Sequence, residues 1–179
     1  MATFYFLRIA LKNLPKNMKI MSFFKKMIYT YCVYAKIFVI LQREMLKRKA
    51  DNNLLAAQKL INAHTFPTES VHCSYYAVLQ KMKYVLAHTD RNPLTYEQQK
   101  ELAENDPTNS THEVILRETR DRIKSPSERK AFVDQLRNLK KERVRADYTE
   151  EVFTEDEGLE CKAMAESLMK KLTFNFGQL

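Results

Sequence analysis

The sequence holds very little glycine and proline, two and five residues respectively among 179. An all-β fold needs many turn residues, so this scarcity excludes a sandwich or a barrel. Cysteine is also scarce, because Cys32, Cys73 and Cys161 are too few and too widely spaced for a disulfide framework or a paired metal motif. The four histidines are scattered and carry no metal signature. We therefore expect reduced thiols, a cytoplasmic location, and neither a metal nor another cofactor.

Acidic residues are almost absent from the first quarter of the chain. Residues 1–44 hold eight bases and a single acid, Glu44, whereas the other 135 residues hold 22 bases and 21 acids. The N-terminal quarter therefore carries +7 of the net charge of +8, and this charge does not indicate that the rest of the chain binds nucleic acid. The same quarter holds nine of the nineteen aromatic residues, and the composition changes sharply at Met45.

Residues 1–44 also lack an apolar run long enough to span a membrane. Their longest such stretch is about fifteen residues and contains Lys36, whereas a transmembrane helix needs roughly 20. No small-residue cleavage site of a signal peptide follows it. Two interpretations remain: a basic amphipathic segment that touches a membrane or a partner, and translated upstream sequence before a native start at Met45. We expect the second, with the domain at residues 45–179 and without membrane association.

The sequence does contain a series of helical patterns with clear start signals. Apolar residues recur at helical spacing over 46–64 and over 69–88, and in the second range they cover enough of the circumference to predict a central helix. The polar connector 89–110 contains one short helix with Thr95 and Gln98 as its capping residues. Three further helices are predicted to start at Ser110 with Glu113, at Ser125 with Pro126 and Glu128, and at Thr154 with Glu157. The pattern predicts an all-α, antiparallel up-and-down bundle of four to five helices.

The helix that starts at Ser125 carries the first candidate site residue. Its apolar stripe runs through Leu139 and continues, one turn later, onto Arg143. Arg145 lies about 200 degrees around the helix and is expected to face water. A buried arginine needs a carboxylate or an opening onto a cleft, and Asp147, one turn on, is the nearest partner. Either the two residues form an ion pair that only fastens the bundle, or Arg143 opens onto a binding site.

The other polar residues near these positions are expected to have ordinary roles. His112 lies in the first turn of its helix and is expected to be solvated near the cap, whereas His72 is expected to be a core or interface histidine. Tyr75 belongs to the apolar stripe and Tyr76 lies beside it, which favours packing within the bundle. The bases that we expect to be solvated are Lys140, Lys141 and Arg145.

The order and spacing of these patterns resemble the HEPN domain, a family of helical bundles named for higher eukaryote and prokaryote nucleotide binding. The resemblance runs from about Met45 to about Leu172. It is carried mainly by Tyr75, Tyr76 and Ala77 in one helix and by Arg143, Ala146, Asp147 and Tyr148 in another. It implies an up-and-down bundle, a homodimer formed through the face with the arginine, a small nucleotidyltransferase partner in toxin-antitoxin pairs and, in many members, metal-independent RNase activity.

The sequence departs from the family's RNase motif, which is an arginine followed by four to six residues and a histidine. Positions 148–150, where that histidine would stand after Arg143, hold Tyr148, Thr149 and Glu150. A tyrosine, with a reference pKa of about 10, is a poor general base for RNA cleavage at neutral pH. An arginine can still bind phosphate, and a tyrosine can still stack on a nucleotide or hydrogen-bond to it.

We therefore predict a HEPN-like module that binds a nucleotide or nucleic acid such as RNA and is non-catalytic or of degenerate activity. The predicted binding residues are Arg143, Asp147, Tyr148, Tyr75 and Tyr76. The alternative is a metal-independent RNase of the toxin-antitoxin type, in which Arg143 and Tyr148 act with a histidine brought from another helix.

Overall fold

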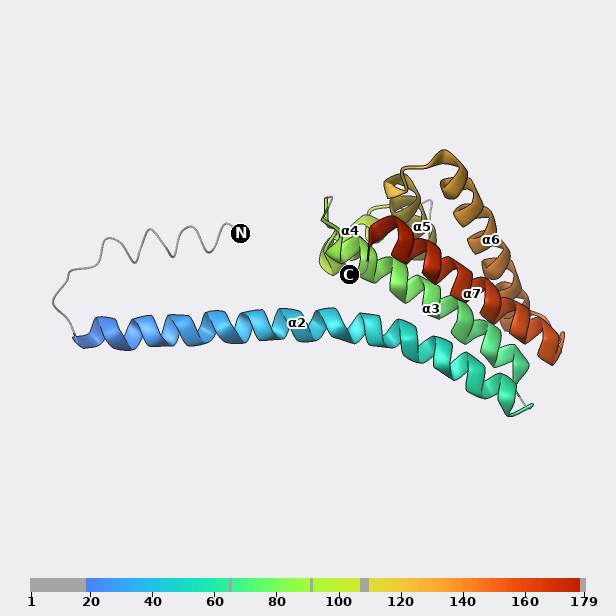
Figure 1. The fold of residues 1–179 in the computed structure, drawn as a ribbon, viewed down its shortest axis with the longest axis horizontal. Helices are drawn as coiled ribbons and strands as arrows, with labels where there is room; N and C mark the ends of the chain where they lie inside the picture. The colour runs from blue at the N-terminus through green and yellow to red at the C-terminus, as the bar shows by residue number, and fades with distance from the viewer. Residues whose placement is uncertain (1–18, 65, 91, 107–109, 178–179) are drawn as a thin grey trace. The chain divides into compact units, whose positions relative to one another are not determined.

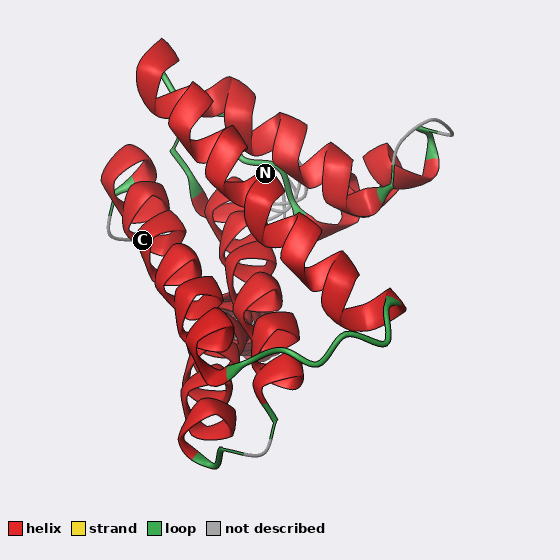
Figure 2. Cartoon of the chain, turned by 90° about the vertical axis from the view of Figure 1, so that its right-hand side faces the viewer, coloured by secondary structure: helices red, strands yellow, loops and turns green. Residues whose placement is uncertain are grey.

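The computed structural model describes residues 19–64, 66–90, 92–106 and 110–177. Within these ranges every regular element is an α-helix, so the predicted all-α class is confirmed (Figures 1 and 2). The helices are α2 (Lys19–Asn62), α3 (Pro67–His88), α4 (Tyr96–Glu104), α5 (Thr111–Arg122), α6 (Pro126–Tyr148) and α7 (Glu155–Phe176).

The chain divides into two compact units, Met1–Gln42 and Arg43–Leu179. Residues 1–18 of the first unit lie outside the described residues, and its remainder forms the first part of α2. The interpretation of the N-terminal segment as sequence upstream of a native start at Met45 stays a prediction. No helix in the described part of the chain is both long and apolar enough to cross a membrane.

Helix α2 begins much earlier than the sequence predicted. We expected a helix over 46–64, but the observed helix starts at Lys19 and runs without a break through the change in composition. The physical reason is that no glycine or proline lies between Pro15 and Pro67, so no residue in this stretch stops a helix once it has formed. A change in composition is therefore a poor guide to the end of a helix.

Helix α3 is the centre of the second unit, as its apolar pattern predicted. It starts with Pro67 at its first position and packs against α4, α5, α6 and α7. Side chains on several of its sides are completely buried, including Val78, Tyr84, Val85 and Leu86. Each large apolar side chain that is fully buried contributes about 1.5 to 3 kcal/mol to folding. Helix α3 thus fixes the positions of the four helices around it.

The predicted helix starts are confirmed, with one difference. Reciprocal capping boxes close at Thr95 with Gln98 and at Thr154 with Glu157, and the Ser125 side chain accepts a hydrogen bond from the Glu128 N–H. At α5 the Ser110 side chain caps the helix, but the Glu113 carboxylate does not return to Ser110. It pairs instead with Lys140 on α6, at 2.5 Å, so the expectation that Lys140 is solvated is wrong. This ion pair joins α5 to α6.

The first turns of α3 and α7 approach each other closely at Gly158. A Cβ atom at this position would lie 2.8 Å from the Ser70 Oγ atom, which is too close for any real contact. Ser70 Oγ is itself held by a hydrogen bond of 2.6 Å to the Pro67 carbonyl. A side chain at position 158 would therefore displace the Ser70 hydroxyl from this hydrogen bond, whereas glycine leaves it in place.

Candidate functional site

Arg143 lies near the end of α6, and most of its side chain is buried. Its Nη2 atom lies 2.7 Å from Asp147 Oδ2, one turn later, which confirms the predicted ion pair. The same nitrogen donates a hydrogen bond of 3.3 Å to the Tyr76 hydroxyl on α3. The Nε atom is buried and has no hydrogen-bond partner among the described residues. Arg143 is therefore fixed between two helices with part of its hydrogen-bonding capacity unused.

Three tyrosine rings surround the Arg143 guanidinium. Its central carbon lies 5.9, 5.6 and 5.8 Å from the ring centroids of Tyr75, Tyr76 and Tyr148. The face of each ring carries partial negative charge and attracts the cation. Tyr148 is the last residue of α6 and is 75% exposed, whereas Tyr75 is buried. The structure thus brings all five predicted site residues into one group.

His72 belongs to the same group, although the sequence did not predict it. Its Nδ1 atom lies 3.2 Å from Asp147 Oδ1, and its ring stacks on Tyr76 with 4.5 Å between centroids. Of the two expected settings, a core or an interface, the core is wrong, because 47% of the side chain is exposed, and the interface stays a prediction. An ionised carboxylate can only accept, so Nδ1 is the donor in this contact and Nε2 is left without a partner on Asp147. The spacing of four residues between His72 and Tyr76 was the available signal.

His112 completes the group from α5. Its Nδ1 atom lies 3.1 Å from the Tyr75 hydroxyl. Burial lowers the pKa of His112, and the positive charges of Arg143, Lys140 and Lys83 lower it further. Burial also raises the pKa of Tyr75 to about 12, so the hydroxyl that shares this hydrogen bond with the imidazole stays protonated at neutral pH. The expectation of a solvated histidine is wrong, because His112 is half-buried and its ring contacts Tyr75 and Tyr76 on α3.

The surroundings of Arg145 differ from those of Arg143 and also contradict the prediction from the sequence. We expected this side chain to face water. It contacts three carboxylates instead, with Glu142 at 3.3 Å, Glu151 at 3.4 Å and Glu157 of α7 in direct hydrogen-bonding contact. Its guanidinium also lies 4.1 Å from the centre of the buried Phe153 ring. Arg145 therefore fastens the end of α6 to the start of α7.

We call the group formed by Arg143, Asp147, Tyr148, Tyr75, Tyr76, His72 and His112 the Arg143 cluster. No arrangement of three or more His, Cys, Asp or Glu side chains that could hold a metal ion occurs among the described residues. Cys32, Cys73 and Cys161 are free thiols.

Comparison with known proteins gives one match. The family model of the HEPN domain matches residues 43–174, a range that contains the whole Arg143 cluster. No curated protein and no solved structure matches the chain.

Proposed function

The chain belongs to the HEPN domain family, and on that premise we propose that the Arg143 cluster binds a phosphate group of a nucleotide or of single-stranded RNA without cleaving it. The observation that carries this proposal is the setting of Arg143. Its guanidinium is held by tyrosine rings, pairs with one carboxylate, and lies beside the exposed ring of Tyr148.

The charges around Arg143 favour an incoming anion. A guanidinium has five N–H donors, more than one carboxylate can engage. Asp147 is also shared, because its Oδ2 faces Arg143 while its Oδ1 faces His72. A largely buried cation with incomplete pairing gains from binding phosphate, and hydrogen bonds between charged groups are stronger than neutral ones.

Tyr148 supports a ligand that carries a base as well as a phosphate. Its ring is exposed and lies next to the guanidinium that would hold the phosphate. Stacking of a base on an aromatic side chain contributes about 1 to 3 kcal/mol and requires a base that is free of a duplex. We therefore expect single-stranded RNA to bind better than the same sequence in a duplex.

Fluorescence anisotropy with a short labelled RNA strand tests this proposal. Arg143→Ala should weaken binding at least about tenfold, because it removes the proposed phosphate contact. Lys141→Ala is the matched control, since Lys141 is an exposed base on the same helix and should be replaceable at little cost. Equal loss of affinity in both variants would show that general positive charge, and not the cluster, binds RNA.

A second candidate function is metal-independent cleavage of RNA, and His72 favours it. The cluster lacks the family's motif histidine, but it places an exposed imidazole on Asp147, beside Arg143. Such an imidazole, oriented by a carboxylate, can take the proton of a 2′-hydroxyl while an arginine stabilises the charge on phosphorus. His112 is less suited, because Tyr75 occupies its Nδ1 atom.

Incubation of RNA with the protein in the presence of a chelator separates the two functions. Binding without the appearance of shorter products supports the first. Cleavage that His72→Gln abolishes, with RNA binding retained, would establish the second and overturn the non-catalytic proposal. The corresponding His64→Gln variant is a control, because His64 pairs with Glu155 outside the cluster.

A further inference from the structure

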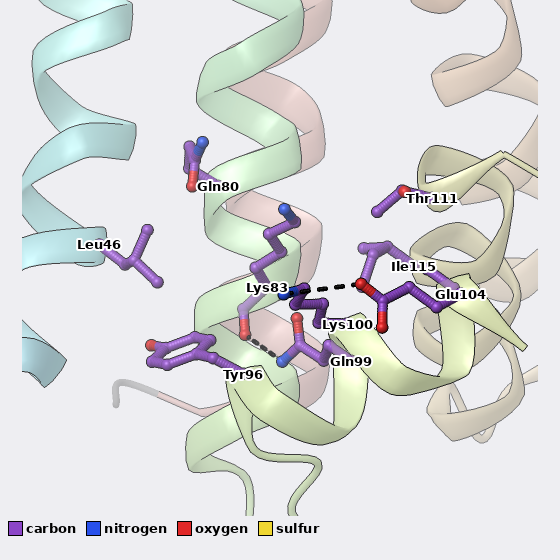
Figure 3. Close-up of a pocket in the computed structure, with 10 residues that line it drawn as sticks. Leu46, Gln80, Lys83, Tyr96, Gln99, Lys100, Glu104, Thr111 and Ile115 are labelled. Carbon is purple, nitrogen blue, oxygen red and sulfur yellow. Dashed lines mark hydrogen bonds and ion pairs between the residues drawn. The ribbon is translucent and has the colours of Figure 1, made fainter.

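A cavity of about 470 Å³ lies among the helices of the second unit, on residues that the Arg143 cluster does not use. Its walls come from α2, α3, α4 and α5, as Figure 3 shows. The apolar part consists of Leu46, Ala103, Ile115 and the ring of Tyr96. Cavities of this size, with apolar walls and a few polar groups, are typical of sites for small molecules.

Lys83 supplies an amine to this cavity without a matching carboxylate. The side chain is half-buried, and burial lowers its pKa. Among the described residues no carboxylate forms an ion pair with Lys83. The acid in the cavity wall, Glu104, pairs at 3.6 Å with Lys100, and Figure 3 shows the Lys83 amine well apart from that pair. A half-buried ammonium group without a partner favours a ligand that brings a negative charge.

The Gln99 side chain links two helices of the cavity wall and has one polar atom without a hydrogen-bond partner in the described part of the chain. This side chain is 3% exposed, and its Nε2 donates to the carbonyls of Lys83 and Leu94 at 3.0 and 2.8 Å. The first of these bonds is drawn in Figure 3. The two bonds join α4 to α3 and fix the amide's orientation, because a flipped amide would place two oxygens against each other. Its Oε1 has no partner among the described residues.

We propose that this cavity binds a small organic carboxylate with an apolar body. The carboxylate would pair with the Lys83 ammonium, and the body would lie against Leu46, Tyr96 and Ile115. Since Lys100 pairs with Glu104, Lys83 is the one cation of the wall without a carboxylate among the described residues, and it suits a monoanion, whereas a phosphate dianion would need further donors to leave water. The apolar walls supply the remaining affinity through burial of the ligand's body.

The cavity is coupled to the Arg143 cluster through α5. Thr111 lines the cavity, and the next residue, His112, belongs to the cluster. The positive charge of Lys83 is one of the causes that hold the pKa of His112 low. A carboxylate bound to Lys83 would offset this charge and raise the pKa of His112. The pKa of His112 therefore reports whether the cavity is occupied, independently of a direct measurement of binding.

Titration of the full-length protein with sodium benzoate, followed by NMR, tests the proposal. We expect chemical-shift changes at the methyl groups of Ala103 and Ile115, and a higher pKa of His112 in the saturated protein. Lys83→Met should weaken benzoate binding at least about tenfold and remove the change at His112. Lys141→Met, at an exposed lysine outside the cavity, should change neither.

Several outcomes would overturn the proposal. One is the absence of shift changes at Ala103 and Ile115 in the wild-type protein, a result that does not depend on the folding of any variant. Another is unchanged affinity in Lys83→Met. Equal binding of inorganic phosphate and benzoate would show that the apolar body contributes nothing.

Discussion

Arg143 and Arg145 stand two residues apart at the end of α6, yet their surroundings differ in the number of carboxylates. Arg145 contacts three of them, from α6, the following loop and α7, and lies on Phe153. Arg143 pairs with Asp147, which it shares with His72, and is otherwise surrounded by aromatic rings. The Nε atom of each arginine lacks a hydrogen-bond partner among the described residues, so the two differ in neutralisation: three carboxylates surround Arg145, and one shared carboxylate pairs with Arg143.

The difference separates a stabilising arginine from a binding one. An arginine whose donors face several carboxylates has little to offer a ligand, but it holds the segments that supply those carboxylates together. An arginine with one shared carboxylate keeps the capacity to bind an anion. We expect mutations of Arg145 to change stability and mutations of Arg143 to change binding.

The largest expected effect comes from Arg143→Lys. Lysine keeps the charge but lacks the planar group that contacts Asp147, Tyr76 and a phosphate together. RNA affinity should fall by about 2 kcal/mol, roughly thirtyfold, as measured by fluorescence anisotropy. The free energy of unfolding in urea should change by less than about 1 kcal/mol. A large loss of stability would show that Arg143 is a structural residue like Arg145.

Arg145→Ala should have the opposite result. Removal of the guanidinium leaves Glu142, Glu151 and Glu157 close together without a cation and uncovers Phe153. The free energy of unfolding should fall by about 1.5 kcal/mol in urea denaturation, while RNA affinity stays the same. Arg137→Ala, at an exposed position of α6, is the control and should have almost no effect. A loss of RNA binding in Arg145→Ala would contradict the separation of roles.

The same comparison shows why sequence reasoning placed one arginine correctly and the other wrongly. Arg143 and Asp147 lie four residues apart on one helix, so helical spacing alone predicts their contact. The contacts of Arg145 with Phe153 and Glu157 depend on how α7 returns against α6, which no local pattern contains. Most of the helix starts were predictable for the same local reason, because a capping residue and its partner lie three positions apart.

The predictions for His72 and His112 were wrong for a related reason. The position of His72 depends on the packing of α3 against α6, and that of His112 on the packing of α5 against α3. A reading of one helix at a time could not show that both would meet the tyrosines beside Arg143. The predicted start of α2 was wrong for a different reason. A change in composition predicted the boundary of a helix that no residue interrupts.

Tyr148→Ala should have a smaller effect than either arginine variant. The exposed ring offers a stacking surface and contributes little to the core. RNA affinity should fall about fivefold, near 1 kcal/mol, with stability unchanged within about 0.5 kcal/mol. Tyr148→Phe should bind as the wild type does, because stacking needs the ring and not the hydroxyl. Equal weakening in both variants would assign the contribution to the hydroxyl instead.

The smallest expected effect is the pH dependence that His112 contributes to stability. Its pKa is lower in the folded than in the unfolded protein, so the unfolded state takes up the proton more readily. The contribution is therefore complete above the unfolded pKa of about 6.5 and is lost as the pH falls through the folded value. Urea denaturation at pH 7.5 and 5.0 should show a smaller acid loss in His112→Gln than in the wild type. An identical loss in both would refute this role.

The contact between α6 and α7 depends on Gly158, a residue without a side chain. The first turn of α7 rests directly on the first turn of α3, and Glu157, the neighbour of Gly158, contacts Arg145. A methyl group at position 158 would displace the Ser70 hydroxyl or move the first turn of α7, with Glu157, away from α3. The ion pair of Glu157 with Arg145, which joins α6 to α7, would then weaken. The junction between α6 and α7 therefore depends on the contact of Gly158 with Ser70 on α3.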